Sequence, residues 1–299
     1  MHEIDFYGKK LNAYKSSLHN HSTTSDGFYS PEQLIELYQQ QGYDVFAFTD
    51  HRKTNPVSTY DGRGMTLISG MEMHPWGPRA IPLHLLALGV PEDFVFPLRE
   101  DAQGTIDAAK ATGAAVFCAH PVWCGLTFED VAAFKNLDGI EVYNRCCQAK
   151  GRAYSMQLWD ELSTKGLVYP ALAVDDTHNS FTLFKGVTYI IAEDKSPASV
   201  LDALKNGRIY ASQGPVITKL SLVDGVFEAE FSPCTEVIGM TNPSGGYCVE
   251  IEDKRGYGSG AVEITSAKIQ LVQADAPLWF RLQIKDAAGR YAWSAPIVY

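Results

Sequence analysis

The chain has 299 residues, of which 45% are hydrophobic and 20% are charged, a composition typical of a globular protein with one large core or two domains. Acidic residues outnumber basic ones by 35 to 25, which gives a formal net charge of −10, and there is no long run of Lys or Arg. We therefore expect neither a nucleic-acid scaffold nor an anionic membrane as a partner. An anionic substrate would need a local device, such as metal ions, to bind against this field.

The apolar segments and the cysteines predict a cytoplasmic protein. No apolar run approaches the roughly 20 residues that span a bilayer, and residues 1–17 lack the apolar segment of a signal peptide. The six cysteines form no CxxC pair, and in a chain of this length they are typical of reduced core residues. They are Cys118, Cys124, Cys146, Cys147, Cys234 and Cys248.

Residues 1–212 alternate apolar strands with amphipathic helices. The clearest helix, "SPEQLIELYQQQG", has Ser30 as its cap, Pro31 in its first position, Gln33 to complete a capping box and Gly42 at its end. Further helices are expected near 102–112, 127–136, 152–165 and 197–206, and strands at "DVFAFTD", "MTLISGME", "LHLLALG", "AAVFCAH", "GIEVYN", "LVYPALAVDD" and "GVTYIIA". This α/β alternation predicts a parallel sheet covered by helices, which seven or eight strands can close into a barrel.

Residues 213–299 have a different character. No helical pattern is convincing after "GRIYASQGP", and strand-like runs such as "VFEAEFS" and "LWFRLQIKD" are separated by Asp-Gly, Gly-Gly, Asn-Pro and Ala-Gly turn signals. We therefore predict two domains, a barrel over 1–212 and a small Ig-like, all-β sandwich over 213–299.

Potential metal ligands stand where apolar strands end. Side chains two residues apart in a strand share a face, so His19 and His21 point the same way, as do Asp176 and His178. Three further strands end at His51, Glu72 and His120. In a βα barrel such strand ends open on one face, where active sites are built.

Taken singly, these residues say little. A lone histidine at a strand end is usually a satisfied polar residue, and Asp26 in "SDG" is a typical turn residue. Six of the eight histidines nevertheless lie at strand ends or within short apolar strands, namely His19, His21, His51, His84, His120 and His178. We predict that the other two, His2 and His74, are surface residues. The combination of imidazoles and carboxylates favours a Zn, Mn or Fe site.

The motifs "HNHSTTSDG", "FTDH", "GME", "HLLALG", "AHP" and "DDTH", in this order, resemble those of the PHP (polymerase and histidinol phosphatase) family of metal-dependent phosphoesterases. "LDALKNGRIYASQGP" and "WFRLQIKDAAGRYAWSAPI" resemble the stretches that follow this core in the CehA/McbA-like branch. The resemblance implies a distorted TIM-like barrel of about seven strands that binds two or three divalent ions. It also implies hydrolysis of a small phosphate ester by a metal-activated hydroxide.

The resemblance further implies which residues bind each ion. The first ion would be held by His19, His21, Glu72 and Asp176. Glu72 would bridge to a second ion held by His84 and His120, and a third would be held by Asp26, His51 and His178. A buried core histidine is the alternative interpretation of His84. Asp175, where the family often has a small residue, is expected to orient a ligand histidine.

Other residues are candidates for roles beyond metal binding. His51 or His178 could act as general acid for the leaving alcohol if one ion is absent. Arg52, Arg145 and Arg79 could recognise phosphate, or could each be a surface ion-pair residue. Candidates for lining the pocket, with plain packing as the alternative, are Trp76, Trp123, Tyr143 and Asn144.

Two other functions stay open on the sequence. The same activated hydroxide could attack a carbonyl carbon, which would make the chain a hydrolase of a carbamate, ester or amide. A third hypothesis is a metal-stabilised, non-catalytic module that binds a protein or glycan through its β-sandwich. The full set of predicted ligands favours an enzyme that acts on a small molecule.

Overall fold

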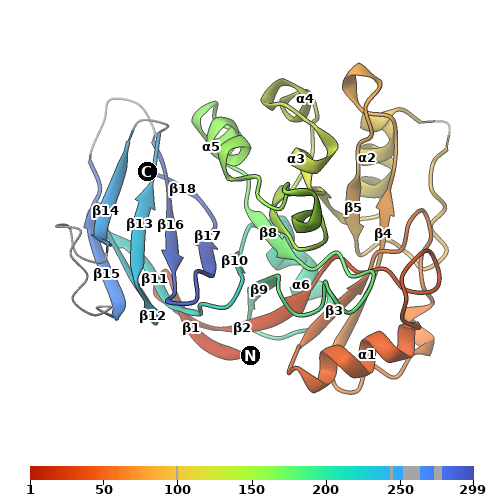
Figure 1. Cartoon of the computed structure of the whole chain (residues 1–299), viewed down its shortest axis with the longest axis horizontal. Helices are drawn as coiled ribbons and strands as arrows, with labels where there is room; N and C mark the ends of the chain where they lie inside the picture. The colour runs from red at the N-terminus through yellow and green to blue at the C-terminus, as the bar shows by residue number, and fades with distance from the viewer. Residues whose placement is uncertain (99, 243–244, 252–262, 273–277) are drawn as a thin grey trace.

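The computed structural model describes residues 1–98, 100–242, 245–251, 263–272 and 278–299 (Figure 1). The first of its helices, α1 (Pro31–Gln40), begins as the sequence predicts. The Ser30 side chain accepts a hydrogen bond from the Gln33 backbone, and the Gln33 side chain accepts one from the Ser30 N–H. The helix buries Leu34, Ile35 and Tyr38 against the sheet. Within the described residues, no helix is long and apolar enough to cross a membrane.

Short apolar strands form the core of the N-terminal part. In chain order they are β1 (His2–Phe6), β2 (Lys9–Ser17), β3 (Val45–Phe48), β4 (Thr66–Met73), β5 (Leu85–Leu88), β6 (Ala115–Cys118), β7 (Gly139–Asn144), β8 (Ala171–Val174), β9 (Val187–Ala192) and β10 (Ile209–Ser212). The remaining helices are α2 (Ala102–Ala111), α3 (Pro121–Cys124), α4 (Phe128–Ala132), α5 (Met156–Thr164) and α6 (Pro197–Lys205). Every residue of β3, β5, β6, β7 and β8 is buried, as expected for strands covered on both faces. The fold is therefore mixed α/β.

The sheet is only partly parallel, which corrects the prediction of a parallel sheet. Strands β2, β3 and β4 are parallel, and so are β6, β7 and β8. Strand β5 is antiparallel to both β4 and β6, and β9 is antiparallel to both β2 and β10. The reason lies in the connections. Between β4 and β5 the chain has only a 3-10 turn (Pro78–Ala80), whereas a parallel pair needs a longer crossover.

The pairing runs from β9 through β2 to β8, and one side chain joins its two ends. The Thr188 hydroxyl donates a hydrogen bond to the Ala173 carbonyl at 3.0 Å and accepts one from the Ala173 N–H at 3.1 Å. Strand β8 is thereby tied to β9 through a side chain rather than through a backbone ladder. Just beyond β2 and β8, backbone hydrogen bonds link the two chain segments directly, from the His21 N–H to the Thr177 carbonyl at 2.9 Å and from the Thr177 N–H to the His19 carbonyl at 3.3 Å.

The C-terminal part is all-β in the described residues, as predicted. Its strands are β11 (Ile217–Val223), β12 (Val226–Cys234), β13 (Glu236–Met240), β14 (Gly246–Ile251), β15 (Ile264–Gln270), β16 (Trp279–Lys285), β17 (Tyr291–Ser294) and β18 (Ile297–Val298). One layer pairs β11 with β12 and β12 with β15, and another pairs β14, β13, β16 and β17 in that order. Phe227 of the first layer packs against Phe280 of the second at a ring separation of 4.6 Å.

The two parts share one continuous sheet (Figure 1). Strand β1 is antiparallel to β2 but also pairs in parallel with β11, and β10 pairs with β17. In addition, the fully buried Arg281 of β16 forms an ion pair with Asp160 of α5, and its guanidinium lies 4.1 Å from the ring of Trp159. The proposed division at residue 212 stays a prediction, and strand pairs cross it.

Candidate metal centre

The predicted ligands come together at one edge of the sheet. His19 and His21 follow β2, His51 follows β3, and Glu72 lies near the end of β4. His120 follows β6, while Asp176 and His178 follow β8. His84 precedes β5, and because β5 is antiparallel to its neighbours, its start lies at the same edge as the ends of β4 and β6. The antiparallel strand thus explains how a histidine before a strand joins those that follow strands.

The carboxylate of Glu72 is the centre of the cluster. Glu72 is 1% exposed, and its two oxygens lie within 3.5 Å of the ring nitrogens of six histidines. The distances are 2.6 Å to His51, 2.8 Å to His84, 3.1 Å to His120, 3.3 Å to His74, 3.4 Å to His21 and 3.5 Å to His19. Both oxygens of this carboxylate therefore face imidazole nitrogens, as a ligand shared by two ions would require.

Two further carboxylates complete the cluster. Asp176 lies 3.1 Å from His21, 3.3 Å from His19 and 3.4 Å from His178. Asp26 lies at the outer edge with its side chain 56% exposed, 3.5 Å from His51 and 3.6 Å from His178. The side chains therefore fall into overlapping groups, one of which is His21, Asp26, His51 and His178, with ligand atoms within 4.8 Å of one another.

Many buried ligand atoms in this cluster lack a hydrogen-bond partner. They are Nε2 of His19, both ring nitrogens of His21, Nδ1 of His51, Oε2 of Glu72, Nε2 of His74 and Oδ1 of Asp176. Buried polar atoms are nearly always hydrogen-bonded, so a concentration of orphaned donors and acceptors needs an explanation. Imidazole and carboxylate atoms converging in this way fit divalent metal ions.

The charge state of the carboxylates also suits cations. Burial alone would raise the pKa of Glu72, but the surrounding histidines, His19 foremost, hold it well below its usual range. The pKa of Asp176 is lowered against the same effect of burial, chiefly by His19 and His21. Desolvation lowers the pKa of His74 to about 4, so its ring is neutral at pH 7. Against the effect of burial, the neighbouring carboxylates raise the pKa of His19 well above its usual value, so a metal ion would have to displace a proton there. Ionised carboxylates and neutral imidazoles are the forms that bind metal.

Glu141, which the sequence analysis missed, holds two of the ligand histidines. Its carboxylate accepts a 2.6 Å hydrogen bond from Nδ1 of His19 and a 2.8 Å bond from the His120 N–H. Asn144, expected to line the pocket, is buried and donates to both Glu141 and Asp176. Such contacts fix the ring of His19 with Nε2 facing the cluster. One feature of the sequence could have identified Glu141: it is a charged residue inside the apolar strand "GIEVYN".

Asp50 and Gly27 shape the loop that carries Asp26. The buried carboxylate of Asp50 accepts hydrogen bonds from the backbone and hydroxyl groups of Ser22 and Ser25. A Cβ on Gly27 would lie 2.1 Å from the His21 carbonyl oxygen, so only glycine allows the loop to pass this close. The "SDG" turn is thus required for its backbone as well as for its carboxylate.

Asp175 holds a loop and, within the described residues, forms no hydrogen bond or ion pair with a histidine of the cluster, contrary to expectation. Its carboxylate accepts hydrogen bonds from the Tyr38 hydroxyl and from the N–H groups of Phe184, Lys185 and Gly186. Its neighbour Asp176 adopts a positive φ of 52°, which turns that side chain toward the cluster. The two adjacent carboxylates therefore have separate tasks.

The two histidines predicted to be surface residues are both at least partly buried. His2 lies 3.0 Å from the Ile217 carbonyl oxygen, away from the cluster, because β1 is sandwiched between β2 and β11. His74 belongs to the cluster, since it follows Glu72 by two residues along an extended segment and so shares its face. The spacing that identified His19 and His21 was present here as well.

A cavity of about 200 Å³ opens onto the cluster. Its wall includes Trp123, Cys146, Cys147 and Lys150 beside histidines and carboxylates of the cluster. Lys150 is the one Lys or Arg among the described residues that line it. The 3-10 turn from Cys146 to Lys150 therefore brings a positive charge to a site that otherwise carries only carboxylates and histidines.

The arginines proposed for phosphate recognition make contacts of other kinds. Arg52 donates to the His74 carbonyl, and its guanidinium lies 5.3 Å from the ring of Phe96. Arg145 stacks 4.0 Å above Phe181, and Arg79 forms an ion pair with Asp130. Trp76 is 74% exposed, and Tyr143 donates to Gln148. A role for Arg52 or Arg145 in the reaction stays a prediction.

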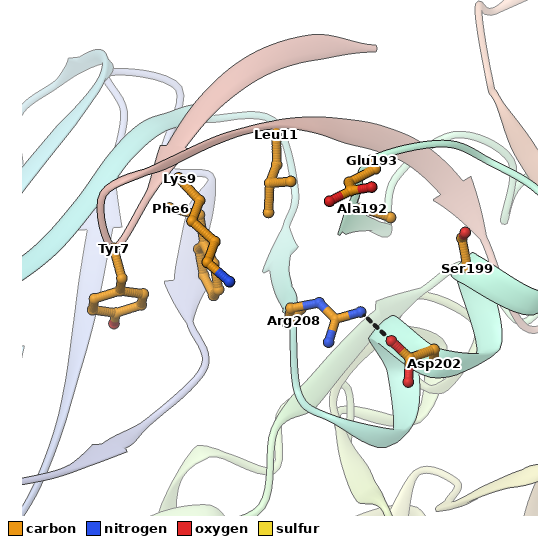
Figure 2. A pocket seen from close by; sticks show the side chains of 9 residues that line it. All are labelled: Phe6, Tyr7, Lys9, Leu11, Ala192, Glu193, Ser199, Asp202 and Arg208. Carbon is orange, nitrogen blue, oxygen red and sulfur yellow. Dashed lines mark hydrogen bonds and ion pairs between the residues drawn. The ribbon is translucent and has the colours of Figure 1, made fainter.

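A second cavity, of about 420 Å³, lies between the β1–β2 turn and α6 (Figure 2). Figure 2 shows Lys9 and Arg208 on its walls, with Arg208 paired to Asp202 at 2.5 Å. No His or Cys is among the described residues that line this cavity. It therefore lacks the imidazole and thiolate ligands that favour Zn.

Comparisons with known proteins find one partial sequence match and one similar fold over nearly the whole chain. No family model matches it. An 80-residue stretch is 35% identical to the phosphoribosyl 1,2-cyclic phosphate 1,2-diphosphodiesterase of Eggerthella lenta, which is 25% of this chain and 30% of that enzyme. The match thus spans under a third of the enzyme's length.

Two solved structures align with the chain to different extents. A two-domain protein from Bacteroides vulgatus, described as containing a predicted PHP-like metal-dependent phosphoesterase, matches with a TM-score of 0.57 and 17% identity, over 97% of this chain and 95% of the other. An amidohydrolase from Chromobacterium violaceum matches with a TM-score of 0.43 and 15% identity, over 55% of this chain and 87% of the other. The chain therefore shares the fold of the first protein over nearly its whole length.

Proposed function

We propose that the chain is a metal-dependent hydrolase that cleaves a small phosphate ester. The observation that carries this proposal is the set of ligand atoms around Glu72, many of them buried without a hydrogen-bond partner, at the base of a cavity lined by Lys150. The partial match to a phosphodiesterase and the shared fold with a PHP-like protein support the same chemistry.

The ligand set fits two or three divalent ions of Zn, Mn or Fe. The proposed groups are His19, His21, Glu72 and Asp176, then Glu72, His84 and His120, then Asp26, His51 and His178. Ions bound there would lower the pKa of a bound water and neutralise the charge on the phosphate. Glu72 and Asp176 both lie next to His19, so each carboxylate could contribute to more than one of these groups.

Side chains of the protein would bind the ester and donate a proton to the leaving alcohol. Lys150 is placed to attract the phosphate into the cavity, and Trp123 offers a ring against which the leaving group can pack. His51 and His178, at the exposed side of the cluster near Asp26, are candidates to donate a proton to the leaving alcohol. Arg52 and Arg145 remain candidates for phosphate contact if their side chains turn toward the cavity.

The proposal also covers the protein family, the domain architecture and the cellular location. We propose membership of the PHP family and of its CehA/McbA-like branch, a distorted barrel over 1–212, a sandwich over 213–299 and a cytoplasmic location. The near-circuit from β9 through β2 to β8, closed by Thr188, supports the barrel.

A direct assay tests the phosphatase proposal. Purified protein loaded with Mn²⁺ or Zn²⁺ is screened against phosphate monoesters and diesters, with a chelator control and with Glu72→Gln as the variant that loses the central ligand. We expect chelator-sensitive hydrolysis that Glu72→Gln abolishes and that His2→Gln, outside the cluster, retains. A metal-loaded protein that hydrolyses none of these esters contradicts the proposal.

Hydrolysis of a carbamate, carboxylic ester or amide is the second candidate. It is favoured by the placement of Arg52 and Arg145, whose guanidinium groups contact Phe96 and Phe181 rather than the cavity. An uncharged carbonyl substrate does not need cationic side chains to bind it. The same screen with p-nitrophenyl acetate and an aryl carbamate separates the two candidates. Exchanging Arg52 or Arg145 should harm phosphate chemistry far more than carbonyl chemistry.

A further inference from the structure

We propose that His74 is a metal ligand and that it completes, with His51 and Glu72, a coordination site that for His51 is the alternative to the third ligand group given above, because a neutral imidazole binds one ion at a time. This inference rests on the metal cluster of the proposed function but not on which bond is cleaved. It assigns to His74 a role that neither the motifs nor the comparisons give it.

The backbone places His74 for this role. His74 follows Glu72 by two residues, so both side chains leave the extended chain on the same face. The segment is fixed from the adjacent strand end, because the Arg52 N–H donates to the Glu72 carbonyl at 2.9 Å and the Arg52 guanidinium donates to the His74 carbonyl at 3.2 Å. The imidazole is therefore preorganised, as metal ligands usually are.

The nitrogen that faces the cluster has no other task. Nε2 of His74 is buried, forms no hydrogen bond and lies 3.3 Å from Oε2 of Glu72. Nδ1 of His51, equally buried and without a hydrogen bond, lies 2.6 Å from the same oxygen. Three orphaned ligand atoms thus converge on one point, and His51, Glu72 and His74 form a group whose ligand atoms lie within 4.8 Å of one another.

The neighbouring ring does not occupy this position. His84 stacks face to face on His74, with ring centres 3.9 Å apart and planes 8° apart, but its Nδ1 lies 2.8 Å from the other oxygen, Oε1. Each oxygen of Glu72 therefore has a separate imidazole from this stacked pair. His84 belongs to the group with His120, and His74 to the group with His51.

Metal content provides the first test. His74→Gln is compared with wild type and with His2→Gln, a matched control because His2 is the one histidine outside the cluster. We expect His74→Gln to lose about one equivalent of bound Zn²⁺, or to bind one ion at least roughly tenfold more weakly in chelator competition. Unchanged content and affinity in a variant with native circular dichroism would overturn the proposal.

A donor exchange tests direct contact rather than support. In His74→Cys loaded with Co²⁺, a coordinating thiolate gives a new sulfur-to-cobalt charge-transfer band relative to wild type, whereas His2→Cys gives none. A fully loaded His74→Cys without this band counts against a ligand at this position. The wild-type difference spectrum is needed because Cys146 and Cys147 already line the cavity.

A measurement on wild type covers the case in which these variants fail to fold. Crystals soaked in Zn²⁺ should show an anomalous peak about 2.0–2.1 Å from Nε2 of His74. A saturated cluster with no ion bonded to that nitrogen overturns the inference. Bound metal without any hydrolytic activity would instead count against the proposed function and leave the assignment of His74 intact.

Discussion

Single residues outside the ligand set decide how well the ligands are held. Glu141 is the main one, since its carboxylate bonds to the ring of His19 and to the backbone of His120 on different strands. Asn144 adds a link from Glu141 to Asp176. Through two side chains of β7, three proposed ligands from β2, β6 and β8 are therefore oriented together.

Exchange of Glu141 should weaken metal binding without removing a ligand. In Glu141→Gln the amide cannot accept from both His19 and the His120 N–H, so one of the two contacts is lost. We expect metal affinity to fall about 10- to 100-fold, measured by chelator competition. Glu161→Gln on exposed α5 is the control. Equal affinity in Glu141→Gln and wild type would show that these contacts do not orient the ligands.

Lys150 is expected to act on substrate and not on metal. Lys150→Met should raise KM for an anionic phosphate ester about 10- to 100-fold, since one charge-assisted contact contributes roughly 1.5–3 kcal/mol, and should leave KM for a neutral ester unchanged. Metal content should stay at the wild-type value, and Lys150→Arg should restore much of the affinity. Lys165→Met, on the exposed end of α5, is the control. A KM for the phosphate ester that does not respond to Lys150→Met contradicts this role.

Local spacing in the sequence was enough to predict most residues of the candidate site. The long-range contacts that orient them could not be predicted in this way. His19 and His21 could be paired because two residues in an extended chain share a face. Glu141 lies 122 positions from His19, and nothing in the sequence shows which strand will be its neighbour. His74 carried the same signal as His21 but stands outside the motifs of the resemblance, so it was predicted to be at the surface.

Elements were predicted where the signal was local. The capping box at Ser30 and the buried strand "VFAF" both form as expected. The direction of β5 relative to its neighbours was not predictable, because a run of four apolar residues fits a parallel strand and an antiparallel strand equally well. Strand direction follows from the connection, and residues 74–84 contain turns rather than the crossover helix that a parallel neighbour requires.

The tie between β8 and β9 depends on one hydroxyl. Thr188→Val removes both hydrogen bonds to Ala173 and leaves its buried N–H and C=O without this partner. We expect a loss of about 1–3 kcal/mol in the free energy of unfolding, measured by urea denaturation of the metal-free protein. Thr188→Ser retains the hydroxyl and should lose less. Equal stability of Thr188→Val and wild type would mean that the Thr188 hydroxyl contributes nothing to holding these strands together.

On the scale of the whole molecule, buried charge joins the C-terminal strands to α5. The Arg281 guanidinium is fully buried between Trp159 and Trp279 and has Asp160 as its ion-pair partner. Arg281→Met should lower the unfolding free energy by about 3 kcal/mol, because it leaves Asp160 without its partner. Adding Asp160→Leu should recover part of this loss in thermal melts. A double variant less stable than Arg281→Met would show that the pair is not coupled.

The C-terminal part should be inseparable from the metal-binding part. Removing residues 213–299 would take away β11 from the edge of β1 and β17 from the edge of β10, and would expose the buried surface around Trp159. Bare strand edges next to exposed apolar surface favour aggregation. We therefore expect the 1–212 fragment to be insoluble or to bind no metal, judged by size-exclusion chromatography and metal analysis. Full-length Arg281→Met, which keeps both strand pairs, should remain folded and metal-bound. A soluble, metal-binding fragment would mean that the ladders of β1 and β10 contribute little, and would favour a separable binding role for the C-terminal strands.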